Sequence, residues 1–339
     1  MIKKHKRFVF VLVIFLIILA YACQNCPETT FDVAELDFKI PEIFDWTDHG
    51  IIFTAGDSGS WDHLLYGGFA GTSIKKEGVY YLYYQGAYDY DEKYGTVRYR
   101  SIGLATSSDG ITFEKYIRNP ILEWSPKGFL EEGAVSNAVI LDSAKNFLMF
   151  YGANTAVDEW QINADTRLAF SENGLEFTDQ GIVLNHRDKN VWGWGDELFA
   201  VNAIYFMGNY YVYYIINGTM YDEHVGVSWG DKPDKLSKNG RVHENCKAVK
   251  AWGMAGNAQV GENLFLLFMS NVRKSQMEVR IVDLNYPDRV SAALRTYRFD
   301  NFSEGAIIMD EEQSRWLMYY RTSDVNGYGV KSAPLVRSN

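Results

Sequence analysis

Carboxylates and tryptophans recur together at several places along this chain. The carboxylates are Asp62, Glu131, Glu132, Asp196, Glu197 and Glu304, and the accompanying tryptophans are Trp61, Trp194 and Trp252. Indole faces stack on the C–H surfaces of sugar rings, and carboxylates accept strong hydrogen bonds from hydroxyl groups. Cleavage of a glycosidic bond needs one protonated carboxyl as acid and one ionised carboxylate as base or nucleophile. The pattern predicts carbohydrate chemistry, provided that the fold gathers these side chains.

The same acidic residues have simpler interpretations. Asp and Glu often cap turns, and an acidic ring can bind Ca²⁺ or be solvated in a channel. The chain has no Cys and His cluster with the spacing of a zinc site. We expect no cofactor, and a structural Ca²⁺ in a central channel is the one ion left open.

The elements that must position these residues repeat five times. An aromatic segment recurs at intervals of 51 to 67 residues, over 80–84, 147–151, 210–214, 264–268 and 315–320. Each copy follows a segment of small or apolar residues, over 70–74, 137–141, 201–205, 256–260 and 305–309. A third strand comes after each aromatic segment, and a turn such as Asp109–Gly110 or Asn173–Gly174 then leads into a fourth. Four antiparallel strands repeated at this period predict an all-β, five-bladed β-propeller.

The ring is expected to close through its N-terminal strand. Residues 50–53 resemble 120–122 and 181–184, which lead from one blade into the next. Because the copy at 50–53 precedes the first blade, we expect it to pair with the last blade, which leaves no open edge. We therefore assign residues 50–339 to one propeller domain and 23–49 to an N-terminal segment. The acidic residues stand just before the innermost strands, which should meet at one mouth of the channel.

The first 22 residues resemble an export signal. Lys3 to Arg7 is basic, 8–20 is apolar, and Ala20-Tyr21-Ala22 matches a small-x-small cleavage pattern. Cys23 follows directly, as in a bacterial lipobox. We expect an exported protein, either a cell-envelope lipoprotein or a periplasmic or extracellular one, with an uncleaved anchor as the alternative.

The overall charge limits the partners. The net charge is −10 and becomes more negative when the basic leader is removed. An acidic body argues against nucleic acid as a partner. We expect an oligo- or polysaccharide partner, membrane contact only through a lipid on Cys23, and a monomer.

Longer motifs carry a family resemblance. The run 80–86, then 102–115 with Ser107-Ser108-Asp109-Gly110, then Asn119-Pro120-Ile121-Leu122 resembles the five-bladed propellers of glycoside hydrolase families 43, 32, 62 and 68. The plan is closest to family 43. That resemblance implies inverting hydrolysis with Asp62 as base and Glu197 as acid. The family's blade-two Asp is absent here, where Glu131 or Glu132 stands nearby and Asn137 lies in the inner strand.

The resemblance implies an exported hydrolase of arabinose- or xylose-type or related glycans. Trp61, Trp194, Asp196, Trp252, Asn137 and Glu304 are the predicted substrate contacts. Two alternatives are a non-catalytic cell-surface glycan-binding propeller and a phosphorylase similar to family 130. The phosphorylase needs a basic phosphate site, for which Arg98, Arg100, Arg167 and Arg321 are candidates. The nucleophile motif of family 32, Asn-Asp-Pro, is absent.

Overall fold

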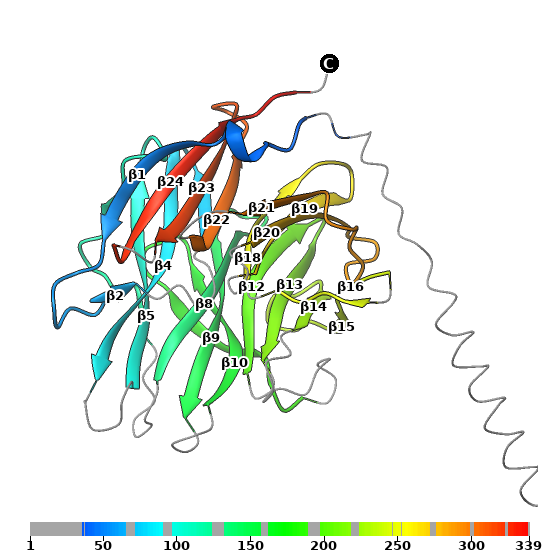
Figure 1. Ribbon diagram of the computed structural model, residues 1–339. Helices are drawn as coiled ribbons and strands as arrows, with labels where there is room; N and C mark the ends of the chain where they lie inside the picture. The colour runs from blue at the N-terminus through cyan, green and yellow to red at the C-terminus, as the bar shows by residue number, and fades with distance from the viewer. Residues whose placement is uncertain are drawn as a thin grey trace, which may run out of the picture.

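The chain folds almost entirely into β-strands (Figure 1). The computed structural model describes residues 36, 38–65, 72–90, 97–123, 132–156, 162–188, 197–217, 224–245, 247–251, 253–271, 276–298, 302–322 and 325–337. Within these residues there is one short 3₁₀ turn, η2 (Ile43–Asp45), and no α-helix. None of the described helical segments has the length and apolarity to cross a bilayer.

Strand pairing groups the described strands into five antiparallel units, which we call blades one to five. Blade one comprises β2 (Leu64–Leu65), β3 (Thr72–Lys76), β4 (Val79–Tyr90), β5 (Val97–Ser107), β6 (Glu114–Lys115) and β7 (Leu122–Glu123). Blade two comprises β8 (Glu132–Leu141), β9 (Phe147–Ala156), β10 (Ile162–Ser171) and β11 (Thr178–Leu184). Blade three comprises β12 (Glu197–Phe206), β13 (Asn209–Asn217), β14 (His224–Gly230) and β15 (Lys238–Arg241). The short strands β16 (His243–Glu244) and β17 (Lys247–Ala248) then lead to blade four.

The last two blades complete the ring. Blade four comprises β18 (Gly253–Gln259), β19 (Leu264–Asn271), β20 (Gln276–Asp283) and β21 (Arg295–Arg298). Blade five comprises β22 (Phe302–Asp310), β23 (Arg315–Thr322), β24 (Gly327–Pro334) and the N-terminal β1 (Thr47–Thr54). Strand β1 pairs with β24 from Thr47 opposite Ser332 to Thr54 opposite Gly327. The predicted propeller, with its N-terminal strand completing the last blade, is confirmed.

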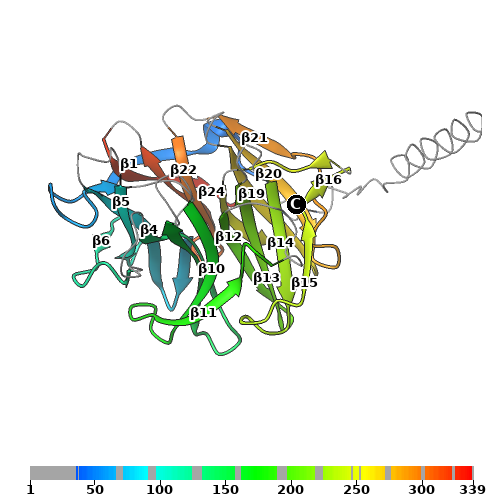
Figure 2. The ribbon, with the colours of Figure 1, turned by 90° about the horizontal axis from the view of Figure 1, so that it is seen from below.

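The innermost strands of the five blades surround the central axis, and they are β3, β8, β12, β18 and β22. Figure 2 shows the blades arranged around this axis. Arg100 of β5 pairs in parallel with Gly133 of β8, and Ala164 of β10 pairs in parallel with Glu197 of β12. The inner strands of blades two and three therefore run in the same direction as the third strand of the blade before them. We call the end of the channel at which the inner strands begin the mouth, and the opposite end the far end. The inner strands begin three to five residues earlier than the sequence predicted in blades two to five, so Glu132, Glu197 and Glu304 lie inside strands rather than before them.

Tyrosine hydroxyls connect blades to their neighbours. Tyr319 of blade five donates to the carbonyl of Gly110 in blade one at 3.1 Å, and Tyr83 of blade one donates to Gly174 in blade two at 2.9 Å. In blade three, Tyr213 donates to the Pro287 carbonyl of blade four at 3.1 Å. These tyrosines are buried, and burial raises their pKa values above the ordinary range. They are part of the core.

The turns that receive these hydroxyls depend on local chemistry. Asp109 accepts hydrogen bonds from the backbone N–H groups of Ile111 and Thr112, both at 2.7 Å. Burial alone would raise the pKa of Asp109, but these N–H donors outweigh it and lower the pKa to about 2. Gly110 has φ +76°, a left-handed conformation that favours glycine.

The N-terminal segment, residues 36 and 38–46, lies across blades four and five at the upper side of Figure 1. The Phe38 ring packs 5.6 Å from that of Trp316 in blade five. In blade four, Tyr297 donates to the Pro41 carbonyl at 2.5 Å, and Arg295 pairs with Glu42 at 2.6 Å. This segment therefore fills the outer part of one boundary between blades.

Candidate functional site

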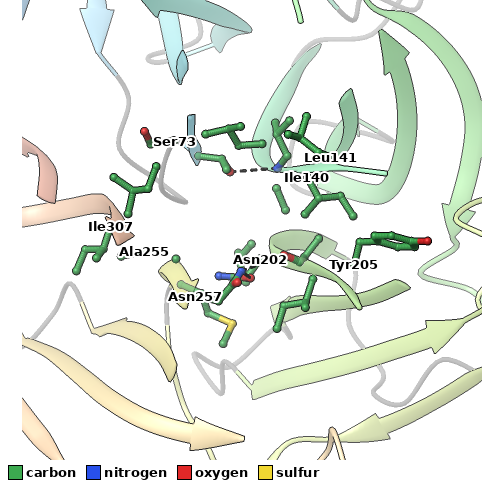
Figure 3. Close-up of a pocket in the computed structure, with 18 of the residues that line it drawn as sticks. Ser73, Ile140, Leu141, Asn202, Tyr205, Ala255, Asn257 and Ile307 are labelled. Carbon is green, nitrogen blue, oxygen red and sulfur yellow. Dashed lines mark hydrogen bonds between the residues drawn. The ribbon is translucent and has the colours of Figure 1, made fainter. Parts of the chain in front are cut away.

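A cavity of about 310 Å³ occupies the channel, and all five inner strands line it (Figure 3). Its wall in blade two runs from Ala138 to Leu141, and its wall in blade three runs from Val201 to Tyr205. In blade four the wall runs from Met254 to Asn257, in the first half of β18, so the cavity is not confined to one end of the channel. None of the side chains predicted for the site lines this cavity.

A belt of polar side chains lies along the wall of this cavity and joins neighbouring inner strands. Asn257 Nδ2 donates to Asn202 Oδ1 at 2.7 Å and to the Ala203 carbonyl at 3.0 Å. In the same way the Thr72 backbone N–H donates to Asn137 Oδ1 at 3.2 Å, and Thr72 Oγ1 donates to the Asn137 carbonyl at 2.7 Å. Inner strands present backbone groups to the axis that no further strand pairs, and these side chains satisfy some of them.

Asn137 belongs to this belt. Its side chain is buried, with 1% exposed, and among the described residues its Nδ2 has no hydrogen-bond partner. A buried amide without an acceptor costs about 1–3 kcal/mol. The substrate contact predicted for Asn137 stays a prediction, and its observed contacts join blades one and two.

Two of the predicted carboxylate residues have their backbone at the mouth. Glu132 is the first residue of β8, and Glu197 is the first residue of β12. Gly133 pairs with Arg100 of blade one, and Glu197 pairs with Ala164 of blade two. The two glutamates therefore begin neighbouring inner strands at the same end of the channel. Glu304, the third residue of β22, lies near the same end of blade five.

Four predicted site residues lie outside the described residues. They are Glu131, Trp194, Asp196 and Trp252. Their predicted roles are untested and stay predictions.

Asp62 lies at the boundary between blades one and five. Its carboxylate is buried and accepts from Lys115 Nζ at 2.6 Å, Ser60 Oγ at 3.1 Å and the Tyr84 hydroxyl at 3.3 Å. Burial, followed by the charge of Asp62, raises the pKa of Tyr84 above its ordinary value. Because Lys115 belongs to the outer strand β6, these partners of Asp62 come from blade one and its leading loop rather than from the channel.

Trp61 also packs against blade one. Its ring packs 5.6 Å from that of Tyr84, and a Cβ at Gly103 would lie 2.8 Å from the indole Cζ2. The indole therefore covers the glycine-containing surface of β5. Stacking on a sugar and base catalysis by Asp62 both stay predictions, and the structure adds a packing role for each residue.

Sequence reasoning missed an acid–histidine pair in blade two. Asp165 Oδ1 lies 2.8 Å from His186 Nδ1 and accepts from the His186 backbone N–H at 2.9 Å. Arg187 Nε donates to His186 Nε2 at 3.2 Å. Asp165 adjoins Ala164, the residue that pairs with Glu197, so the pair lies toward the mouth. The two residues are 21 positions apart with no motif between them, and only strand pairing reveals the contact.

The described residues contain no group of three or more His, Cys, Asp or Glu side chains arranged to hold a metal ion. The structural Ca²⁺ that the sequence left open stays untested, because the side chains of several carboxylates at the mouth lie outside the described ones.

Comparisons with known proteins give a likeness of fold. No protein-family model and no curated protein matches the sequence. A glycosyl hydrolase from Bacteroides ovatus is similar in structure, with a TM-score of 0.58, 15% identity, and coverage of 92% of this chain and 98% of that one. A family 117 glycoside hydrolase from Zobellia galactanivorans has a TM-score of 0.58, 13% identity, and coverage of 86% and 90%.

A third similar structure is a β-1,2-mannobiose phosphorylase from Listeria innocua in complex with β-1,2-mannobiose. Its TM-score is 0.56 at 13% identity, with coverage of 80% of this chain and 90% of that one. At such identities the likeness shows a shared fold. That fold is the one that the resemblance to propeller glycoside hydrolases predicted.

Proposed function

We propose that this chain is an exported glycoside hydrolase that binds an oligo- or polysaccharide at the mouth of its propeller. The observation that carries the proposal is the placement of Glu132 and Glu197 at the start of neighbouring inner strands. The similar solved structures are named as glycoside hydrolases and a mannobiose phosphorylase, which supports action on glycosidic bonds.

The proposed reaction is inverting hydrolysis of arabinose- or xylose-type or related glycans. Glu197 gives its proton to the leaving glycosidic oxygen as the bond from that oxygen to the anomeric carbon breaks. A carboxylate on the other side takes a proton from water, and the water oxygen forms the new bond. An inverting pair stands about 6.5–9.5 Å apart to admit that water. The base is the predicted Asp62 or, in its place, the blade-two glutamate Glu132.

Substitution of the acid tests the proposal. Glu197→Gln should lower kcat by about 10²- to 10⁴-fold, because general acid catalysis is lost. Sugar affinity, measured by calorimetry, should change little. The matched control is Glu172→Gln, an exposed carboxylate in the turn after β10, at the far end. Unchanged turnover in Glu197→Gln would remove the acid assignment, and screening a panel of nitrophenyl glycosides and polysaccharides would identify the sugar.

The role of Asp62 requires two variants, because it also pairs with Lys115. Asp62→Asn removes the carboxylate, whereas Lys115→Met removes the ion pair and keeps the carboxylate. A catalytic Asp62 predicts that only Asp62→Asn loses turnover in the folded fraction. A packing role predicts that both variants unfold at lower denaturant and that their folded fractions turn over normally.

A phosphorylase is the second candidate, favoured by the fold it shares with the mannobiose phosphorylase. Arg100 adjoins Gly133 at the mouth, whereas Arg167 is engaged by Asp179 at 2.5 Å. Phosphorolysis predicts turnover that requires inorganic phosphate and yields a sugar 1-phosphate. Phosphate-independent release of reducing sugar identifies the hydrolase. Binding without turnover, in the wild-type chain, identifies the glycan-binding alternative.

A further inference from the structure

Both ends of the described chain lie at the far end of the propeller. The inner strand β22 ends at Asp310, which pairs with Arg315 at the start of β23. Arg315 in turn pairs with Pro334 at the end of β24, and Ser332 pairs with Thr47 at the start of β1. The segment that precedes β1 therefore reaches the propeller at the end opposite the mouth. Figure 1 shows this segment and the C-terminus at the upper side, with the β4–β5 and β9–β10 hairpins directed downward.

The far end also carries most of the exposed large apolar side chains. Nine such side chains are exposed among the described residues, and five of them belong to far-end turns or termini: Ile43, Phe44, Met207, Tyr286 and Val336. Phe44 in η2 is 80% exposed, and Met207 in the turn between β12 and β13 is 75% exposed. Of the nine, Val325, in the β23–β24 hairpin, is the one at the mouth.

Ion pairs lie beside some of these side chains. Glu42 pairs with Arg295 beside η2, and Glu311 pairs with Arg337 beside Val336. Lys331 pairs with Asp48 at the base of β1. At Tyr286 the Arg289 guanidinium lies 5.1 Å from the ring centroid. The exposed apolar side chains of η2 and Val336 therefore stand beside paired charges, and Tyr286 stands beside a cation.

We propose that the far end is the membrane-proximal face of the anchored protein. Phe44, Met207 and Tyr286 enter the interfacial layer of a lipid bilayer, so that the mouth points away from the membrane. The proposal rests on the predicted N-terminal attachment, through a lipid on Cys23 or the uncleaved apolar segment. It does not depend on the proposed hydrolase activity.

The energetics of such contact are modest but sufficient. Complete burial of one large apolar side chain contributes about 1.5–3 kcal/mol. The attachment keeps the propeller near the bilayer, so contact by these side chains becomes an intramolecular step with a high effective concentration. The attachment provides affinity for the membrane, and the two or three exposed apolar side chains orient the propeller on it. Because salt screens charges and not apolar contacts, contact through these apolar side chains should persist in high salt.

Depth-dependent fluorescence quenching tests the orientation. The full chain, purified from the membrane fraction with Cys26→Ser and Cys246→Ser, is labelled with an environment-sensitive fluorophore at Met207→Cys or Val325→Cys. Both positions are exposed turn residues, one at each end of the propeller. Vesicles of phosphatidylcholine containing headgroup-spin-labelled lipid should quench the 207 label at least threefold more than the 325 label, in low salt and in 1 M NaCl.

Other outcomes overturn the proposal. Equal or reversed quenching would mean that the far end does not face the bilayer. Concentration-dependent protection of the 207 label without vesicles would identify a second copy of the chain as the occupant. In a second comparison, Phe44→Ser should reduce quenching at 207, whereas Ile182→Ser, on outer strand β11, should leave it unchanged. Loss of hydrolysis leaves each of these results intact, so the two proposals fail separately.

Discussion

Two boundaries between blades are closed by different means. Between blades five and one, Tyr319 donates to Gly110, and Lys75 of blade one pairs with Asp310 of blade five at 2.6 Å. Arg315 contacts the same carboxylate at 3.3 Å. Between blades four and five, the N-terminal segment covers the boundary through contacts such as that of Phe38 with Trp316.

The difference follows from the side chains that each blade turns toward the next one. Tyr319 of blade five packs toward blade one, whereas the side chains of β19 that pack toward blade five, Leu266 and Phe268, have no hydroxyl to reach their neighbour. The cover supplies apolar area instead, with Phe38 and Tyr297 both buried. A buried polar group stabilises only while every partner is satisfied, whereas an apolar cover contributes in proportion to its area. The two boundaries should therefore respond differently to substitution and to pH.

The largest effect should come from Asp310→Ala. The carboxylate is buried, and its removal leaves Lys75 and Arg315 without their shared partner. Breaking a buried pair costs about 3–5 kcal/mol of unfolding free energy, measured by denaturant titration. Glu312→Ala is the matched control, since Glu312 also pairs with Lys75, at 2.7 Å, but is 74% exposed. It should cost under about 1 kcal/mol. Equal losses would contradict a special role for the buried carboxylate.

Phe38→Ala should have nearly as large an effect at the covered boundary. The ring is 3% exposed, and its loss leaves a cavity against Trp316. We expect a loss of about 3 kcal/mol in unfolding free energy. Phe44→Ala, in the same segment but exposed, should change it by less than about 0.5 kcal/mol. If both variants unfold alike, the segment does not close this boundary.

Acid should weaken the boundary between blades five and one selectively. Burial alone would raise the pKa of Asp310, but hydrogen bonds from Lys75 and Tyr80 and the Lys75 charge hold it below 3.8. A depressed folded pKa contributes stability that is present above the unfolded value and lost as pH falls through the folded value. Hydrogen exchange near Leu317 should therefore accelerate below about pH 4 in the wild type. Asp310→Asn should lack this acceleration, and its persistence would assign the effect to another group.

Tyr319→Phe should cost about 1 kcal/mol, because the Gly110 carbonyl loses a buried donor. Tyr83→Phe should cost a similar amount between blades one and two. Tyr286→Phe, at an exposed tyrosine, is the control and should unfold like the wild type. Thermal unfolding measures all three, and a neutral Tyr319→Phe would mean that packing alone holds the boundary.

The smallest effect is expected for Glu42→Gln. Its pair with Arg295 is partly exposed on both sides, so its loss should cost less than about 1 kcal/mol and less still at high salt. Denaturant titrations at 0.05 and 1 M NaCl check this. A loss comparable to that of Phe38→Ala would show that charge, rather than apolar area, secures the segment.

Much of the fold was predictable, because strand pairing within a blade is local in sequence. The aromatic repeats, the turn at Asp109–Gly110 and the return of β1 to blade five were all anticipated and observed. Strand starts were less predictable. Glu132 and Glu197 are charged residues that a hydrophobic pattern places outside a strand, but pairing with the adjacent β9 and β13 brings them inside.

The sequence predicted at which end of the propeller the candidate site lies, but not which side chains form it. The sequence determines five repeats, and repeats of one kind must place equivalent residues at equivalent ends of a closed ring. It does not determine which carboxylate faces a ligand, because that depends on partners distant in the chain. Tertiary structure brought Lys115 to Asp62 across 53 positions, and Lys75 to Asp310 across 235. Such pairs form only when blades pack, since burial of a charge demands a partner and the ring decides which one is within reach.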